Sequence, residues 1–246
     1  MKKISKKELS IKKDFIVFDN ANTKVVFTTA SDNKSYNRNT EDGVENLQSL
    51  KEKFGVSRVI YLKQVHSDII ISYRGEKEED VIANEGDAII SDVKDAIIGV
   101  FVADCTPVII VDDNKKILAA VHSGWKGTFK SITKKTIDRL VSEYNVNTED
   151  LKVYIGPHIR QCCYEISNEL KEKFIEEKEI PEEKLFKGRN LSMEECILAD
   201  LRMCNIREEN INSIDLCTHC EDEIKLFSYR GSDGDYGRLF AFALIK

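Results

Sequence analysis

The sequence has little histidine, proline or tryptophan, and it has no long apolar run. Histidine occupies four positions, proline three and tryptophan one of the 246. Four histidines are too few for a cluster of several copper ions held by imidazoles. No apolar run is long enough to cross a bilayer, and the basic residues 1–13 lack the apolar core of a signal peptide. We therefore expect a cytoplasmic protein with no membrane partner.

An excess of positive charge is also missing. The chain carries 37 lysines and arginines against 43 aspartates and glutamates, which gives a formal net charge of −6. No broad cationic surface is then available to neutralise a phosphate backbone, so nucleic acid is not an expected partner. The sequence leaves the oligomeric state open.

No repeat, proline-rich linker or low-complexity block divides the chain. Hydrophobic residues make up 41% and charged residues 33% of the sequence, a balance typical of a globular protein. These features favour one domain over residues 1–246, of which residues 1–55 are the least readable. The seven cysteines are an odd number in a chain large enough to fold without cross-links, so we expect reduced thiols rather than a disulfide framework.

Hydrophobic patterning indicates interleaved strands and helices. Amphipathic helices are predicted over residues 127–144, over residues 167–177 and from Ser192, where Glu195 completes a capping-box pattern. The polar residues 33–43 predict a mobile loop. Buried or half-buried strands are predicted over residues 15–26, 58–65, 96–103, 108–111, 117–121, 213–216, 225–229 and 238–245. Because some adjacent strands are joined by short turns, the pattern favours a mixed α/β or α+β fold over a purely parallel sheet.

Three residues with metal-binding side chains follow predicted strands. His66, Cys105 and His122 each lie at or just beyond a strand end, where side chains from separate segments can converge in a cleft. Imidazole and thiolate are both zinc ligands. The long separations between the three residues are not diagnostic of a metal site, however. On spacing alone, hydrogen-bonded histidines and a small buried cysteine are the more frequent interpretation.

The residues around these positions resemble the YfiH family, whose members are also called laccase-domain or polyphenol oxidase proteins. Six short segments between about residue 56 and the C-terminus match in the family's order, which is more specific than any one of them alone. They are Lys63-Gln64-Val65-His66, Gly86-Asp87-Ala88, Ala103 to Val108, Val121 to Gly127, Ile155-Gly156-Pro157 with Cys162 to Glu165, and Phe227 to Arg230 with Gly237-Arg238. The resemblance implies a layered sandwich of mixed β-sheets flanked by helices.

Membership of this family would imply a zinc enzyme. His66, Cys105 and His122 fall on the family's ligand positions and leave a fourth tetrahedral position open, as a catalytic zinc requires. Such a zinc acts as a Lewis acid and lowers the pKa of bound water. The family is associated with phosphorolysis of adenosine, inosine, guanosine and methylthioadenosine and with deamination of adenosine. The resemblance therefore implies purine nucleosides and phosphate as small-molecule partners and Zn²⁺ as the cofactor, with Cu²⁺ as the alternative.

Further candidate residues lie in the matching segments. Asp87 and Asp104 could orient a ligand histidine or move a proton, although each could equally be a turn or capping residue. Lys126 and Arg238 could bind phosphate, and a solvated surface charge is the alternative for each. Gln64 could contact substrate, while a solvated polar side chain is more frequent.

Other functions remain open at this point. The family's older name claims a copper-dependent polyphenol oxidase, or laccase. The same residues also fit a hydrolase in which Cys105 is the nucleophile, His122 the base and Asp87 or Asp104 the orienting group. Some family members are linked to the removal of wrongly built peptidoglycan precursors, an editing role that the sequence does not exclude.

Two features lie outside the resemblance. Ala30 stands where the family's Phe-Thr-Thr-Arg segment has arginine, which puts an anion contact in doubt. Cys217 and Cys220 form a Cys-x-x-Cys pair that could bind a second metal, but no matching pair elsewhere in the sequence completes four ligands. Buried, reduced cysteines are therefore favoured there and at Cys162-Cys163.

Overall fold

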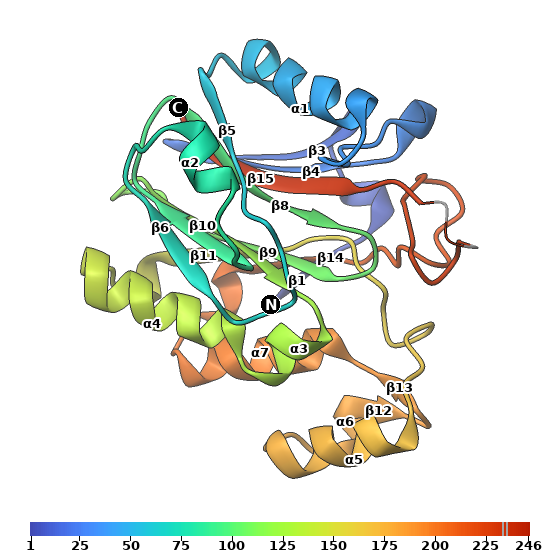
Figure 1. The fold of residues 1–246 in the computed structure, drawn as a ribbon. Helices are drawn as coiled ribbons and strands as arrows, with labels where there is room; N and C mark the ends of the chain where they lie inside the picture. Colours follow the sequence, from blue (N-terminus) through green and yellow to red (C-terminus); the bar gives the residue numbers. More distant parts are fainter. Residues whose placement is uncertain (233, 235) are drawn as a thin grey trace.

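Two mixed β-sheets lie face to face and carry helices on their outer surfaces (Figure 1). The computed structural model describes residues 1–232, 234 and 236–246. The expected layered sandwich of mixed sheets flanked by helices is confirmed. Among the described residues, no helix combines the length and the apolar content needed to cross a membrane.

The larger sheet has seven strands and includes the N-terminus. Its strands pair in parallel at β1–β14, β11–β14 and β6–β7 and are antiparallel elsewhere. In spatial order they are β1 (Lys2–Ile4), β14 (Ile211–Ile214), β11 (Leu151–Ile155), β9 (Thr106–Asp112), β10 (Ile117–Ser123), β7 (Ala88–Ser91) and β6 (Ile70–Tyr73).

The smaller sheet has six strands and includes the C-terminus. Only β5 and β8 pair in parallel; the other neighbours are antiparallel. In spatial order the strands are β2 (Ile11–Lys12), β3 (Phe15–Asp19), β4 (Thr23–Thr28), β15 (Leu239–Ile245), β8 (Ala96–Val102) and β5 (Arg58–Ile60).

The hydrophobic core forms three layers because each sheet is covered on both faces. Along β9, Ile109 and Val111 pack between the two sheets, whereas Val108 and Ile110 pack against the helices outside the larger sheet. The central strands β8, β9, β10 and β15 are accordingly buried at every residue. This burial explains why the sequences of these strands are nearly continuous apolar runs and do not alternate between apolar and polar residues.

Helices cover the outer faces. α1 (Glu41–Phe54) lies outside the smaller sheet, and α2 (Glu78–Ile82) lies beside the edge strand β5, where Val81 packs into the core between the sheets. Outside the larger sheet lie α3 (Trp125–Phe129), α4 (Ile132–Tyr144) and α7 (Met193–Met203). A small separate cluster next to α3 and α7 contains α5 (Asn168–Glu177), α6 (Glu182–Leu185) and the hairpin of β12 (Phe186–Lys187) and β13 (Asn190–Leu191).

Several predicted elements are confirmed. The helix predicted over 167–177 is α5, capped by Ser167, and the helix predicted from Ser192 is α7, in which the Ser192 hydroxyl accepts a hydrogen bond from the Glu195 amide. The strands predicted over 15–26, 96–103, 108–111, 117–121 and 238–245 are also present, with ends moved by a few residues and the first of them divided into β3 and β4.

Other predictions were wrong in part. The single helix predicted over 127–144 is two helices, because Ser131 has a φ of 55°, which interrupts the helix between α3 and α4. Residues 225–229 form no strand, and the strand predicted over 58–65 ends at Ile60. The strand predicted over 213–216 is β14 at Ile211–Ile214. The loop predicted over 33–43 stops where α1 begins at Glu41.

Candidate metal centre

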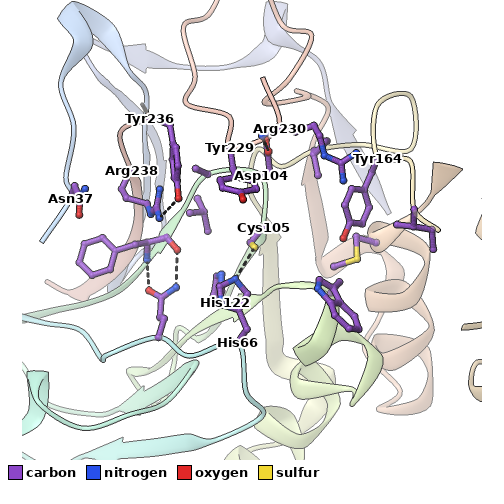
Figure 2. Close-up of a pocket in the computed structure, with 18 of the residues that line it drawn as sticks. Asn37, His66, Asp104, Cys105, His122, Tyr164, Tyr229, Arg230, Tyr236 and Arg238 are labelled. Carbon is purple, nitrogen blue, oxygen red and sulfur yellow. Dashed lines mark hydrogen bonds between the residues drawn. The ribbon is translucent and has the colours of Figure 1, made fainter. Parts of the chain in front are cut away.

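The side chains of His66, Cys105 and His122 converge at one end of the two sheets (Figure 2). His66 lies in the turn after β5, Cys105 in the short turn between β8 and β9, and His122 near the end of β10. Their potential ligand atoms all lie within 4.8 Å of one another, and Cys105 Sγ is 3.8 Å from His66 Nε2. The two imidazole rings are 4.9 Å apart and nearly perpendicular, at 81°. Three side chains from distant parts of the sequence thus form one cluster.

Asp87, just before β7, is hydrogen bonded to both histidine-bearing segments. Its Oδ1 lies 2.7 Å from His122 Nδ1, which leaves the Nε2 atom of that ring free for the cluster. The same carboxylate accepts bonds from the backbone amides of Val65, His66 and Ser67 at 3.3, 3.1 and 2.6 Å. These bonds hold a turn in which His66 has a φ of 57°, a left-handed conformation that costs energy in residues other than glycine.

Charge within the cluster favours a thiolate. Burial raises the pKa of the Cys105 thiol, but the neighbouring His122 and His66 imidazoles outweigh burial and lower this pKa to about 6. Burial lowers the pKa of His122, but Cys105 and Asp87 outweigh it and raise this pKa to about 9. A thiolate is the form of cysteine that binds metal ions, so the protein holds Cys105 in a state ready for a cation.

The backbone of Gly124 lies close to the side chains of His66, Cys105 and His122. A Cβ atom at this position would lie 2.9 Å from His66 Cδ2, 3.2 Å from Cys105 Sγ and 3.5 Å from His122 Cε1. The absence of a side chain at Gly124 therefore leaves room for the three donor groups to meet. Two imidazoles and one thiolate in this cradle fit a tetrahedral transition-metal ion with one open position.

Asp104 holds the turn that carries Cys105, and both of its carboxylate oxygens are occupied. Oδ1 accepts a bond from the Thr218 hydroxyl and Oδ2 from the Arg230 amide, each at 2.6 Å, while the Asp104 carbonyl accepts from the Ile159 amide at 2.9 Å. Asp104 itself has a φ of 82°. These contacts position the turn between β8 and β9 and tie it to two loops that are distant in sequence.

The cluster lies in the wall of a cavity of about 780 Å³, a size suited to a small organic molecule. The cavity is lined by polar, basic and aromatic side chains, which include Asn37, Arg38, Gln64, Phe101, Asp104, Trp125, Tyr164, Tyr229, Arg230, Tyr236 and Arg238. In Figure 2, Arg238 and Tyr236 lie on one side of the cluster, and Arg230 and Tyr164 on the other.

The three residues predicted to bind substrate are placed differently. Arg238 lines the cavity, with its guanidinium over the ring of Tyr236 and Nη2 donating to the Tyr236 hydroxyl at 3.1 Å. Gln64 also lines it, but both ends of its amide bond the backbone of Phe101, at 2.7 and 2.8 Å. Lys126 is exposed, with Nζ 5.6 Å from the Trp125 ring centre, and is not among the described residues that line the cavity.

Sequence reasoning missed several lining residues. Arg38 comes from the polar segment before α1, where nothing in the spacing marks it as a site residue. Tyr164, Tyr229 and Arg230 lie inside the segments that resemble the YfiH family, and their presence there was the available signal. Ala30, which replaces the family's arginine, is fully buried against the hydrophobic core and lies outside the cavity lining.

A sandwich of two mixed sheets between helical layers, with a His-Cys-His cluster at one end, defines the class of protein. The family described as "Multi-copper polyphenol oxidoreductase laccase" matches residues 26–246. The chain belongs to this family, which includes the YfiH proteins.

Relatives cover nearly the whole chain. A purine nucleoside phosphorylase of Clostridium acetobutylicum is 41% identical over 235 residues, which cover 96% of this chain and 97% of the relative. A purine nucleoside phosphorylase of Borreliella burgdorferi is 34% identical over 184 residues, covering 70% and 74% of the two chains. The crystal structure of the hypothetical protein YfiH from Bacillus licheniformis superposes with a TM-score of 0.87 at 22% identity, covering 96% and 97%, which shows that the fold is shared.

Proposed function

We propose that the chain is a zinc-dependent purine nucleoside phosphorylase that also cleaves methylthioadenosine and deaminates adenosine. The single observation that carries this proposal is the shared cavity, in which a His-Cys-His cluster faces arginine and tyrosine side chains. The names of the Clostridium acetobutylicum and Borreliella burgdorferi relatives support the first of these activities.

His66, Cys105 and His122 would hold the zinc ion. When bound, zinc supplies Lewis acidity, which lowers the pKa of a water molecule for attack on the adenine ring. Copper chemistry of the laccase type has less support, because such a centre needs more imidazoles than this chain has. Of the two other histidines, His158 is buried with Nδ1 2.8 Å from the Gly156 carbonyl, and His219 is exposed; neither is among the described residues that line the cavity.

Two arginines are the proposed phosphate-binding groups. In phosphorolysis a phosphate oxygen forms a bond to C1′ of the ribose while the glycosidic bond breaks and its electron pair leaves with the purine. Guanidinium groups bind the phosphate dianion by charge-assisted hydrogen bonds. Arg38 and Arg238 line the same cavity, and Arg38 uses Nη1 to bond the Leu62 carbonyl at 2.9 Å, which fixes its direction. They would supply the anion contact that Ala30 lacks.

Tyr164 is the proposed donor toward the purine. Burial, together with the negative charge of the nearby Cys105 thiolate, raises the pKa of Tyr164 to about 12, so that its hydroxyl keeps its proton at neutral pH. A protonated phenol can donate a hydrogen bond to a nitrogen of the leaving base. The rings of Tyr229 and Tyr236, 5.0 Å apart on another part of the wall, offer apolar faces for the purine.

The test is an assay of purified protein with adenosine, inosine and methylthioadenosine, with and without phosphate. We expect free base only when phosphate is present, together with ribose phosphate from adenosine and inosine and methylthioribose phosphate from methylthioadenosine. In the absence of phosphate we expect inosine and ammonia from adenosine. Arg238→Ala should raise the KM for phosphate. Arg202→Ala should leave it unchanged, because Arg202 is exposed and is not among the described residues that line the cavity. Products no greater than those of a metal-free control would contradict the proposal.

A cysteine hydrolase is the second candidate, and one observation favours it. Asp87, His122 and Cys105 lie in the order of an orienting acid, a base and a nucleophile, with Asp87 Oδ1 2.7 Å from His122 Nδ1. Alkylation separates the two functions. If Cys105 is a zinc ligand, its thiol resists iodoacetamide until a chelator removes the metal; rapid alkylation of the zinc-loaded enzyme would favour the hydrolase.

A further inference from the structure

Four cysteines from two loops meet outside the catalytic cavity. Cys162 and Cys163 lie in the loop after β11, and Cys217 and Cys220 in the loop after β14. Their four sulfur atoms all lie within 4.8 Å of one another, and the Sγ atoms of Cys162 and Cys220 are 3.7 Å apart. No second Cys-x-x-Cys pair occurs in the sequence, and the missing two sulfurs come from the adjacent residues Cys162 and Cys163. The prediction of buried, reduced cysteines is confirmed for Cys217 and wrong about burial for Cys162 and Cys220, which are free but exposed.

The spacing of the sulfurs fits a common cation rather than a disulfide. A tetrahedral site with Zn–S bonds of about 2.3 Å places its sulfurs roughly 3.8 Å apart. A disulfide needs about 2.05 Å. All four cysteines are free thiols. The 3.7 Å between Cys162 and Cys220 is therefore close to the edge of a tetrahedral thiolate site and far from a covalent bond.

The surroundings of Cys217 stabilise a thiolate. Its Sγ accepts a hydrogen bond from the Arg160 amide at 3.4 Å. Amides that point at a sulfur hold it in place and compensate its charge, as the groups around metal ligands do.

The other sulfurs are crowded against one another. The Sγ atoms of Cys162 and Cys220 are 3.7 Å apart, and all four sulfurs lie within 4.8 Å of one another. Without a cation, a second thiolate in this cluster is repelled by the first. The surrounding cavity is lined by three basic side chains, Lys3, Arg160 and Lys184, and by four acidic ones, Glu194, Glu195, Asp215 and Glu221, so the proposed site rests on its four sulfurs and not on the charge of its surroundings.

We propose that Cys162, Cys163, Cys217 and Cys220 bind one zinc ion in a structural site, distinct from the His-Cys-His centre. A tetrahedral set of four soft thiolates selects zinc or iron among the common metals, and zinc requires no change of oxidation state to stay bound. Four protein ligands leave no open position, so this ion stabilises structure and takes no part in the reaction.

The second site would connect the loops that form the wall of the catalytic cavity. Thr218 lies inside the Cys-x-x-Cys pair and donates the 2.6 Å hydrogen bond to Asp104, beside Cys105. Tyr164 directly follows Cys163 and lines the cavity. An ion that joins Cys163 to Cys217 thus fixes both loops in relation to the first centre.

Metal content is the direct test. Full-length protein equilibrated with zinc and then desalted should contain about two equivalents of zinc per chain. Cys162→Ser with Cys220→Ser should lower this to about one, and Cys105→Ser should remove the other. Cys204→Ser, in a cysteine outside both clusters, is the matched control and should keep both. Wild-type protein with one equivalent, lost only in Cys105→Ser, would overturn the proposal.

Thiol protection in the wild-type chain covers the case in which the double variant does not fold. Cysteines are labelled with iodoacetamide before and after chelation and located by mass spectrometry. We expect all four to be protected at least tenfold by zinc, and the exposed Cys162 and Cys220 to react first once zinc is removed. Equal labelling of these two cysteines with and without zinc would contradict the site even if the enzyme is active.

Discussion

Asp87 accepts hydrogen bonds from one predicted metal ligand and from the turn that carries another. Its Oδ1 contacts both His122 Nδ1 and the His66 amide, and its Oδ2 contacts Ser67. The pKa of Asp87 is lowered even though burial alone would raise it, because His122 and Ser67 bond its charged form. The carboxylate therefore acts on the geometry of two ligands at once.

Asp87→Asn tests this role. An amide keeps the size of the carboxylate, but its NH₂ group cannot accept bonds from the ring and the turn together, so zinc affinity should fall roughly 10–100-fold. Competition with a chromophoric chelator measures the affinity. Asp113→Asn is the matched control, since Asp113 also accepts buried bonds, from Asn22 and Thr23, but lies away from the metal centre. Equal zinc affinity in wild type and Asp87→Asn would show that Asp87 does not orient the ligands.

Gly124→Ala should damage the same centre by crowding. The added methyl would lie 2.9 Å from His66 Cδ2 and 3.2 Å from Cys105 Sγ, so at least one ligand must shift, and we expect zinc affinity to fall roughly tenfold with little loss of stability. Gly127→Ala, inside α3, is the control, because its methyl would meet the backbone oxygens of Ser67 and His122 at 3.1 and 3.6 Å and the Ile132 side chain at 3.2 Å, but no ligand side chain. If both variants bind zinc with the affinity of the wild type, a side chain at position 124 does not crowd the ligands and this prediction is wrong.

At the level of single residues, the sequence predicts those site members whose chemistry is unusual. Histidine is rare in this chain, so two histidines and a cysteine at strand ends stand out, and the family-like segments around them point to the same positions. Arginine is common on protein surfaces, so Arg38 could not be distinguished from a solvated charge. The partners of Asp104, in loops more than a hundred residues away along the chain, follow only from tertiary packing.

Among the structural elements, the segment before α1 connects the smaller sheet to the cavity. Tyr36 is fully buried, stacks on Phe240 and donates a hydrogen bond to Asp14 at 3.1 Å, while Lys34 lies 3.2 Å from the same carboxylate. The segment continues to Arg38 in the cavity wall. Its polar composition predicted a mobile loop, but the contacts of Tyr36 and Lys34 with Asp14 hold the segment against the start of β3 at Phe15.

Asp14→Asn should loosen this segment in a pH-dependent way. Burial raises the pKa of Asp14, but Lys34 and backbone bonding outweigh burial and lower it. A lowered carboxyl pKa stabilises the fold above the unfolded value of about 3.9, and this contribution is lost as the pH falls through the lower folded value. We expect Asp14→Asn to reduce the free energy of unfolding by about 1.5 kcal/mol at pH 7.

Urea unfolding between pH 7 and pH 3 measures this effect. The difference between wild type and Asp14→Asn should shrink as the pH falls below about 4. Asp92→Asn removes an exposed carboxylate 3.7 Å from Arg74 and should change the free energy of unfolding by less than about 0.5 kcal/mol at any pH. A difference for Asp14→Asn that stays constant with pH would exclude the charge of Asp14 as its cause.

The helices illustrate which elements a sequence can predict. α5 and α7 begin at serines whose hydroxyls accept bonds from the helix, a local signal that can be read without the fold. The break at Ser131 has no such signal, because serine tolerates a helix interior. It is the fold that places α3 beside the metal centre and α4 across the larger sheet.

On the scale of the whole molecule, the first and last strands of the chain differ in burial and in the number of strands they pair with. β1 is an edge strand with one buried residue, Ile4. β15 lies inside the smaller sheet, pairs with β4 on one side and β8 on the other, and is buried at all seven positions. Hydrophobic patterning could not predict this strand order. It predicted a strand over residues 238–245 but none over residues 2–4, and the partners of both segments lie far away in sequence.

Removal of β15 should therefore prevent folding, while removal of β1 should not. Burial of each large apolar side chain contributes about 1.5–3 kcal/mol, so the loss of residues 239–246 removes an amount comparable to the whole stability of a domain. A chain that lacks residues 2–4 loses only the burial of Ile4 and the pairing with β14, and should still unfold cooperatively in urea with a free energy of unfolding reduced by about 1–3 kcal/mol. Circular dichroism during a urea titration distinguishes the two variants. Cooperative unfolding of the chain without β15 would mean that β4 and β8 can close the smaller sheet without the strand between them.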